Sequence, residues 1–202
     1  EKHDFTHPTE HSCECVFSNA HFPTCPDFGA PTVEKAILKP ALIISPKGEY
    51  ILDFGQNFAG FVRFSGMLRH GQMLKISHGE VLQEGCFYNE NLRSAKAVAE
   101  YVGDGKERVY EPMFTYFGFR YALVEGLDAV SVSDFEGVVL SADIPRACLC
   151  KTADNDINIL IENTYRGQLS NFIDVPTDCP QRDERLGWTA DAQVFASTAC
   201  FN

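Results

Sequence analysis

Short apolar runs separated by turn residues make up the chain from residue 33 to about residue 139. The apolar run Ala41–Ile44 is followed by Pro-Lys-Gly at residues 46–48, a sequence typical of a turn. Apolar and polar residues alternate over residues 73–78, as in a half-buried strand. Residues 114–124 are rich in aromatic residues and have high strand propensity. Many short strands with no helical periodicity between them predict an antiparallel, all-β sandwich.

Glycine and polar residues interrupt the most apolar part of this region. A strand is predicted over residues 50–54, Tyr-Ile-Leu-Asp-Phe. The following Gly-Gln-Asn at residues 55–57 is predicted to end it, because Gly and Asn favour turns. A separate strand is predicted over residues 61–64.

The periodicity changes after Pro145. Between Asp154 and Phe172, apolar residues recur at the spacing of a helix, and Asp154 is a suitable N-cap. The residues after Trp188 are compact or apolar and include no helix breaker, which predicts a second helix. A sheet region followed by helices implies two domains. We expect a linker or the tail of a preceding domain at residues 1–32, a β-sandwich domain at residues 33–145 and the truncated start of a helical domain at residues 146–202.

The charge balance excludes two classes of partner. The formal net charge is −11, and nucleic acids or anionic membranes require a basic surface. A neutral or cationic ligand is compatible with this balance. No apolar run reaches the length of a membrane span, and no signal-peptide pattern opens the chain. Because the chain opens with EKHDFTHPTEH and stops within a predicted helix, we expect an internal fragment, for which a missing signal peptide carries no information.

The eight cysteines are expected to be reduced thiols. An even number permits a disulfide framework, but a chain of this length and apolar content does not require one. Cys13 with Cys15, and Cys148 with Cys150, are spaced like strand neighbours on one face, which is unfavourable for a local disulfide. We therefore expect a cytoplasmic location.

Residues 1–32 contain several histidines and cysteines, which are residue types that can bind a metal ion. Their spacing matches no standard zinc finger or ribbon, so we expect scattered loop residues, no bound metal and no cofactor. The residues concerned are His3, His7, His11, Cys13, Cys15, His21 and Cys25.

The most unusual stretch of the sequence is the acidic segment that begins at Asp174. Pro176 and Pro180 bias the residues before them toward extended geometry, so the segment is predicted to be an ordered loop that leads into the second helix. Loops in such positions commonly carry chemistry. The segment brings together the acidic residues Asp174, Asp178, Asp183, Glu184 and Asp191, the basic residues Arg182 and Arg185, and the single tryptophan, Trp188.

With these residues in view, the chain from about Pro40 onward resembles the bacterial α-L-rhamnosidases of glycoside hydrolase family 78. The more specific half of the resemblance is the acidic segment, DVPTDCPQR at residues 174–182 and ERLGWT at residues 184–189, ending in Asp191-Ala192-Gln193. The other half comprises DFGQNFAG at residues 53–60, HGEVL at residues 78–82, NLR at residues 91–93, and Glu111-Pro112 through Phe119-Arg120-Tyr121.

The resemblance implies a β-sandwich followed by the first helices of an (α/α)6-barrel catalytic domain. It also implies inverting hydrolysis of terminal α-L-rhamnosyl linkages in a rhamnose-containing glycoside, by a protein that could form a homo-oligomer. Glu184 falls at the position of the general acid, and the substrate-binding residues are Asp178, Arg182, Trp188 and Asp191. The general base of the family lies downstream of this chain, so we expect the fragment to be inactive.

Two positions depart from the family pattern. Ala190 stands where a glycine is usual before Asp191, which affects the turn expected there. Phe117 stands where a histidine is common, which removes a polar group expected at the sandwich surface.

The chemistry explains why these residue types occur together. Inversion requires a protonated carboxyl group for the leaving oxygen and an ionised carboxylate that activates water, about 6.5–9.5 Å away. Nearby carboxylates and the Trp188 ring would favour the protonated form of Glu184, whereas Arg182 and Arg185 would oppose it. The Trp188 ring could also stack on the methyl-bearing face of rhamnose.

Each of these residues also has a structural interpretation. Asp178 could brace the loop, Glu184 could pair with an arginine, Asp191 could favour the helix dipole, and Trp188 could belong to the core. For the whole region, the alternatives are a carbohydrate-binding sandwich that uses the aromatic residues 114–121 and a purely structural packing module.

Overall fold

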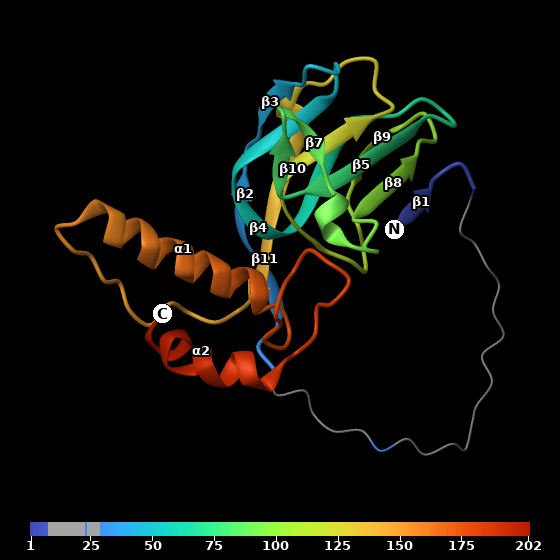
Figure 1. Cartoon of the computed structure of the whole chain (residues 1–202). Helices are drawn as coiled ribbons and strands as arrows, with labels where there is room; N and C mark the ends of the chain where they lie inside the picture. The colour runs from blue at the N-terminus through green and yellow to red at the C-terminus, as the bar shows by residue number, and fades with distance from the viewer. Residues whose placement is uncertain (8–22, 24–28) are drawn as a thin grey trace.

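The computed structural model describes residues 1–7, 23 and 29–202 and consists of a sheet domain with two helices at one end (Figure 1). The strands before the first 3-10 helix are β1 (Lys2–Asp4), β2 (Thr32–Leu38), β3 (Ala41–Ile44), β4 (Tyr50–Met67), β5 (Met73–Gly79), β6 (Val81–Gln83) and β7 (Cys86–Tyr88). The rest of the sheet domain comprises η1 (Glu90–Leu92), β8 (Val98–Val102), β9 (Glu107–Tyr110), β10 (Phe117–Glu125), η2 (Val132–Asp134) and β11 (Phe135–Ala142). The helices are α1 (Asn155–Asn171) and α2 (Thr189–Phe201).

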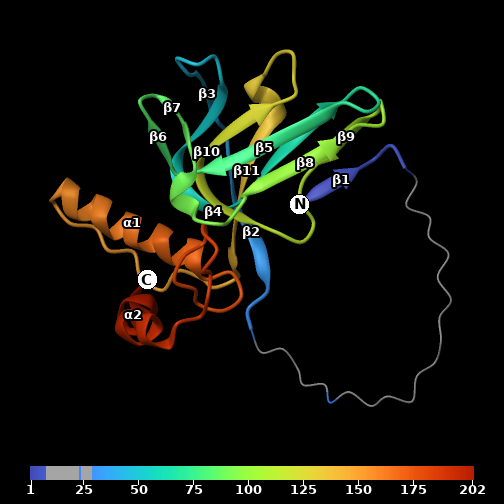
Figure 2. The ribbon, with the colours of Figure 1, turned by 45° about the vertical axis from the view of Figure 1, so that its right-hand side comes forward.

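A single curled sheet forms most of the first domain (Figure 2). Within the described residues it has nine strands in the order β1-β8-β5-β10-β4-β11-β2, with β3 and β9 also paired to β4, and a separate hairpin joins β6 to β7. Its pairs are antiparallel except for β1 with β8. The prediction of a mostly antiparallel sheet domain followed by helices is confirmed. The two layers expected of a sandwich, however, belong to one continuous sheet.

Strand β4 connects the two parts of the curled sheet. The sequence predicts two strands separated by a turn at residues 55–57, and this prediction is wrong: β4 runs through these residues for 18 positions. Gly55 takes a left-handed backbone conformation (φ +75°), which bends the strand without ending it. The first part of β4 pairs with β3 and β10, and its last part pairs with β11 and β9.

An ion pair secures this bend. The Asp53 carboxylate accepts hydrogen bonds from the Arg120 guanidinium at 2.8 and 2.9 Å and from the Gly55 amide at 2.8 Å. Arg120 lies at a register shift between Phe119 and Tyr121 on β10, and its guanidinium stacks on the Tyr121 ring. Arg120 therefore has the structural role that its aromatic neighbours suggest.

The core of the sheet domain is aromatic. Phe54, Phe58 and Phe119 meet in tilted and edge-to-face contacts, and Phe64 packs against Phe135. All five are buried. Their large apolar surfaces stabilise the curled sheet against unfolding, since burial of an aromatic side chain contributes strongly to the free energy of folding.

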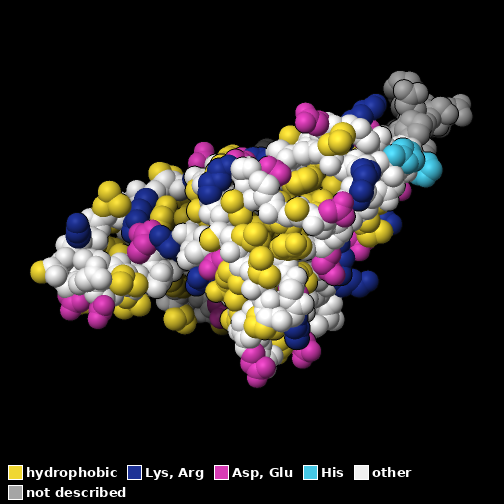
Figure 3. Space-filling model, turned by 90° about the horizontal axis from the view of Figure 1, so that it is seen from above, with side chains coloured by type: hydrophobic (Ala, Val, Ile, Leu, Met, Phe, Trp, Pro, Cys, Tyr) yellow, Lys and Arg dark blue, Asp and Glu magenta, His cyan; other side chains and the backbone are white. Residues whose placement is uncertain are grey.

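The helices have the predicted extent, but their side chains remain at least partly exposed to solvent. Asp154 caps α1 by accepting hydrogen bonds from the amides of Asp156 and Ile157, and α2 begins directly after Trp188. Helix α1 contacts β4 and β11. No residue of either helix is fully buried, and Val194 and Phe201 on α2 are 86% and 60% exposed. Figure 3 shows apolar side chains among charged ones over both the sheet and the helical part.

The N-terminal residues differ in part from the expected linker. Lys2–Asp4 form β1 and extend the sheet at its edge beside β8. His11, Cys13, Cys15, His21 and Cys25 lie outside the described residues. The five cysteines in the described part are free, and residues 148–150 lie in a loop instead of the strand suggested by their spacing. In this part of the chain, no helix combines the length and apolar character needed to cross a lipid bilayer.

The same substitution at two glycines should have opposite effects on stability. A Cβ on Gly60 would lie 1.8 Å from the Val138 carbonyl oxygen, where β4 meets β11. We expect Gly60→Ala to lower the free energy of unfolding by about 3 kcal/mol or more. Gly167 lies within α1 with no atom near its Cβ position. Gly167→Ala should therefore raise the free energy of unfolding by about 0.5–1 kcal/mol. Urea unfolding followed by circular dichroism checks both, and an unchanged midpoint in Gly60→Ala would contradict the packing described here.

Candidate functional site

The loop between α1 and α2 carries the acidic segment and is closed by its own backbone. The Asp178 amide donates to the Leu186 carbonyl at 3.0 Å, and the Leu186 amide donates to Asp178 Oδ1 at 2.8 Å. Before this closure, Thr177 is held by hydrogen bonds to the Asn171 carbonyl at the end of α1. Residues 178–186 therefore form a fixed loop between the two helices.

This loop packs on the sheet domain. A Cβ on Gly118 of β10 would lie within 3 Å of Pro180 and Gln181, so the close approach requires glycine at this position. Arg185 donates to the Tyr116 and Pro180 carbonyls at 3.1 and 2.8 Å, and its guanidinium lies over the Tyr116 ring. Arg185 is thus a structural link between loop and sheet.

Glu184 is paired with two arginines. Its Oε2 accepts a hydrogen bond from Arg93 Nη1 at 3.1 Å and forms an ion pair with Arg182 Nη2 at 2.9 Å, and its side chain is 27% exposed. Arg182 belongs to the same loop, whereas Arg93 comes from the sheet domain. The arginine pairing that the sequence left open as a structural interpretation of Glu184 is therefore present. Of the two arginines considered at first, Arg182 makes this contact, while Arg185 binds backbone carbonyls instead.

The neighbouring carboxylate is also held by the sheet domain. The Ser94 hydroxyl donates a hydrogen bond to Asp183 Oδ2. This bond lowers the pKa of Asp183 below its ordinary value. Two successive residues of the sheet domain, Arg93 and Ser94, thus bind two successive acids of the loop.

Asp178 braces the loop and connects the charged groups. Besides the Leu186 amide, its carboxylate accepts a hydrogen bond from the Cys179 thiol at 3.0 Å and lies 3.6 Å from Arg182 Nη2. Burial alone would raise the pKa of Asp178, but these hydrogen bonds and the Arg182 charge hold it below its usual value. Cys179 is buried, as expected of a structural thiol, and burial raises its pKa. A bracing role for Asp178 is therefore visible in the geometry.

Three of these side chains have the residue types of a metal site. One potential ligand atom from each of Asp178, Cys179 and Glu184 lies within 4.8 Å of the others. Arg182 and Arg93 already supply positive charge to this group, and the raised pKa of the Cys179 thiol opposes the thiolate form that binds metals. This arrangement fits an arginine-neutralised carboxylate cluster better than a metal site.

A groove of about 550 Å³ lies between α1, the loop and α2. Its volume suits a small ligand. Asp178, Trp188 and Asp191 all line it. The Trp188 side chain is 49% exposed, so it is not a core residue. Asp191 lies in the first turn of α2, and Ala190 adopts ordinary helical geometry beside it, so the helix does not require glycine there.

Arg182 faces a second cavity on the sheet side of the loop. This cavity has a volume of about 320 Å³ and is also lined by Gln181 and Tyr116. Within the described residues, Arg182 Nε and Gln181 Oε1 are buried without a hydrogen-bond partner. The five candidate residues therefore divide: Asp178, Trp188 and Asp191 face the groove between the helices, Arg182 faces the sheet, and Glu184 lies in the charged cluster that Asp178 and Arg182 connect.

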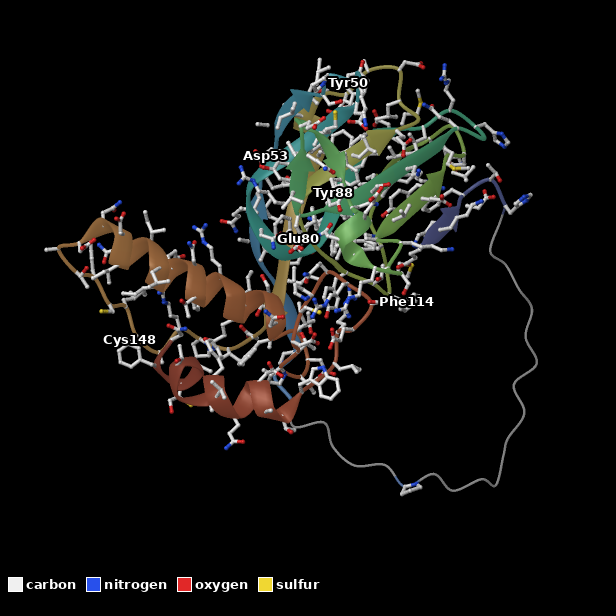
Figure 4. The ribbon with its side chains drawn as sticks, in the orientation of Figure 1. Tyr50, Asp53, Glu80, Tyr88, Phe114 and Cys148 are labelled. Carbon is white, nitrogen blue, oxygen red and sulfur yellow. The ribbon has the colours of Figure 1, made fainter. Side chains whose placement is uncertain are left out.

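The aromatic stretch of the sheet domain is mostly internal. Phe117 and Phe119 are buried, and the Phe117 ring stacks on buried His78 at 3.9 Å. The expectation that Phe117 lies at the surface is therefore wrong, because it follows the inward face of β10. Burial lowers the pKa of His78 to about 3. Phe114, at the lower edge of the sheet in Figure 4, is 90% exposed, but a single exposed ring gives little basis for a carbohydrate-binding surface.

Sequence reasoning missed the contribution of Arg93 and Ser94. Both precede the loop by about 90 positions, so no local pattern connects them with it. The motif Asn91-Leu92-Arg93 contributes to the family resemblance, and this was the available signal that Arg93 matters.

Comparison with known proteins assigns both parts of the chain to related families. Residues 44–141 match the family described as bacterial alpha-L-rhamnosidase concanavalin-like domain. Residues 145–202 match the family described as bacterial alpha-L-rhamnosidase 6 hairpin glycosidase domain.

Individual proteins similar to this chain are named alpha-L-rhamnosidase. The chain is 42% identical over 163 residues to an alpha-L-rhamnosidase of Streptomyces avermitilis and 38% identical over 174 residues to one of Formosa agariphila. These alignments cover 79% and 83% of this chain but 16% and 19% of the two relatives. The chain therefore spans less than a fifth of the length of these proteins.

Solved structures share the fold. The crystal structure of the Streptomyces avermitilis alpha-L-rhamnosidase complexed with L-rhamnose aligns with a TM-score of 0.82 at 39% identity, over 86% of this chain and 17% of that one. The structure of the Aspergillus terreus enzyme aligns with a TM-score of 0.83 at 36% identity, over 89% and 22% of the two chains.

The low pKa of Asp178 predicts a local transition in acid. Because its folded pKa lies below the ordinary value of 3.8, its stabilisation of the loop is present above that value and is lost as the pH falls through the folded pKa. Leu186, which Asp178 binds, is two residues from Trp188, the single tryptophan. We expect Trp188 fluorescence to change with a midpoint below pH 3.8 in the wild type, and we expect this transition to be absent in Asp178→Asn.

Asp174→Asn provides the matched control, since Asp174 is an exposed carboxylate in the same segment. It should retain the wild-type midpoint. If Asp178→Asn and the wild type gave the same acid titration, the bracing role of Asp178 would be refuted.

Proposed function

We infer that this chain, which belongs to the bacterial α-L-rhamnosidase family, is part of an enzyme that removes terminal α-L-rhamnosyl residues from glycosides. The observation that carries this proposal is the acidic loop between α1 and α2. It contains the carboxylates, the arginines and the tryptophan on which the family resemblance rests. The similarity to a relative crystallised with L-rhamnose supports a rhamnose-containing substrate. Acid and base catalysis by carboxyl groups needs no cofactor.

Glu184 is proposed as the general acid of an inverting mechanism. Both arginines contact its Oε2, so Oε1 is the oxygen that we assign to proton donation. The Asp178 carboxylate lies within 4.8 Å of the Glu184 carboxyl group, and Arg182 contacts both of them. A leaving oxygen that approaches Oε1 would receive the proton as the glycosidic bond breaks.

The groove between the helices is proposed as the position of the sugar. Trp188 offers a half-exposed ring for the apolar face of rhamnose, and Asp191 offers a carboxylate for its hydroxyl groups. Asp178 reaches both the groove and the charged cluster, so it would connect the bound sugar to Glu184. Arg182 would act from the other side of the loop, through its contacts with Glu184 and Asp178.

The complete catalytic domain is proposed to be an (α/α)6 barrel that begins near residue 146. The exposed apolar residues of α1 and α2 support this proposal, because further helices would cover them. The general base would come from one of those helices or their loops. We assign the sheet domain, residues 33–145, a packing role beside the barrel, which its buried aromatic core and its contact with the acidic loop support.

Glu184→Gln, made in the longer protein that contains this chain, should abolish most hydrolysis of an aryl α-L-rhamnoside. Loss of general acid catalysis should lower kcat by about 10²–10⁴-fold. The loss should be much smaller for a dinitrophenyl rhamnoside, because this leaving group departs without protonation. Initial rates with both substrates check the assignment, and an equal loss for the two leaving groups would count against a general acid.

The 202-residue chain alone should show no hydrolysis. It supplies the proposed acid but not the base, and removal of either carboxylate function prevents an efficient inverting reaction. The measurement is product release from an aryl rhamnoside by the purified chain, with the longer protein as the positive control. Turnover by the purified chain would contradict the assignment of the base to another segment.

A further inference from the structure

The contact between Arg93 and Glu184 joins two places where the backbone is strained. Arg93 occupies a turn closed by the Ala95 amide and the Leu92 carbonyl at 3.2 Å. Its backbone angles, φ 59° and ψ −122°, match the first central position of a type II′ turn, which is normally glycine. Arg185, next to Glu184, also has a left-handed backbone (φ 48°). Such conformations are costly and concentrate at functional sites.

Stability alone does not account for this arrangement. The Arg93 side chain is 56% exposed, and an exposed ion pair contributes little to folding. Glycine at this position would remove the backbone strain, so the turn itself has no need of an arginine. What only arginine or lysine provides there is a positive charge directed at Glu184.

The groups that surround Glu184 have different partners. Arg182 shares its charge between Glu184 and Asp178, and the Asp178 carboxylate and the Cys179 thiol lie within 4.8 Å of the Glu184 carboxylate. Arg93 faces it from the sheet domain and donates a charge-assisted hydrogen bond to it. Next to it, Ser94 holds Asp183 on the sheet domain.

We propose that Arg93 is a positioning residue for the general acid, so that the sheet domain contributes directly to the chemistry of the helical domain. This inference rests on the proposed function. Arg93 fixes the Glu184 carboxyl group through Oε2 and leaves Oε1 directed to the leaving group.

The test is Arg93→Gly in the longer enzyme. This substitution relieves the strained turn and deletes the guanidinium, so thermal stability should be retained. We expect kcat to fall on the order of ten- to a hundredfold, with a smaller change in KM, because the acid is no longer held in place. The loss should be much smaller for the dinitrophenyl rhamnoside, whose leaving group departs without protonation.

Two further variants separate positioning from structure. Arg93→Lys keeps a cation that can reach Glu184 and should recover part of the kcat for the unactivated aryl rhamnoside. Glu84→Gly is the matched control, since Glu84 is another charged residue with a left-handed backbone (φ 52°) in a turn of the same domain. It should leave kcat unchanged for both substrates.

The outcomes distinguish this inference from the proposed function. If Glu184→Gln retains full activity, the acid assignment fails and the inference fails with it. If Glu184→Gln is inactive but Arg93→Gly keeps the wild-type kcat for both substrates, the proposed function stands and the role of Arg93 is refuted. An equal loss of kcat for the two leaving groups refutes it even if Arg93→Gly is less stable. A loss for the unactivated aryl rhamnoside that is much smaller for the dinitrophenyl rhamnoside, and that Arg93→Lys partly restores, supports it.

Discussion

The pair of hydrogen bonds between Asp178 and Leu186 is the constraint on which the candidate site depends. It closes residues 178–186 into a loop of fixed shape, and the contact with Gly118 seats that loop on the sheet domain. The directions of Arg182, Glu184 and Arg185 follow from this closure. Without this closure, several charged side chains would lose conformational entropy each time a ligand bound.

The electrostatic design of the site places opposite charges close together in a partly exposed setting. Two carboxylates within 4.8 Å would repel each other, and two arginines from different parts of the fold offset that repulsion. Arginine suits this role because its guanidinium can serve two carboxylates at once, as Arg182 does. The site is therefore organised before a substrate arrives, at the cost of strained backbone at Arg93 and Arg185.

Elements that depend on residues close together in the sequence were predicted correctly. The N-cap Asp154, the start of α2 after Trp188 and most strands of the sheet follow from spacing and turn residues. The division of β4 at Gly55 was predicted wrongly, because the ion pair between Asp53 and Arg120 that carries the strand through the bend joins residues 67 positions apart. Residue types also indicated the acidic loop. They could not indicate that Arg93 binds Glu184 or that Phe117 stacks on His78, since these contacts depend on how the two domains and the strands pack.

The helices have a consequence for the order in which the protein acquires its structure during synthesis. The sheet domain has a closed aromatic core and emerges from the ribosome before α1 and α2, so it can fold while translation continues. The helices bury no side chain completely, and helices of this length gain most of their stability from packing. Val194 and Phe201 are therefore apolar surface that a newly made chain exposes, while the acidic loop already rests on the folded sheet domain.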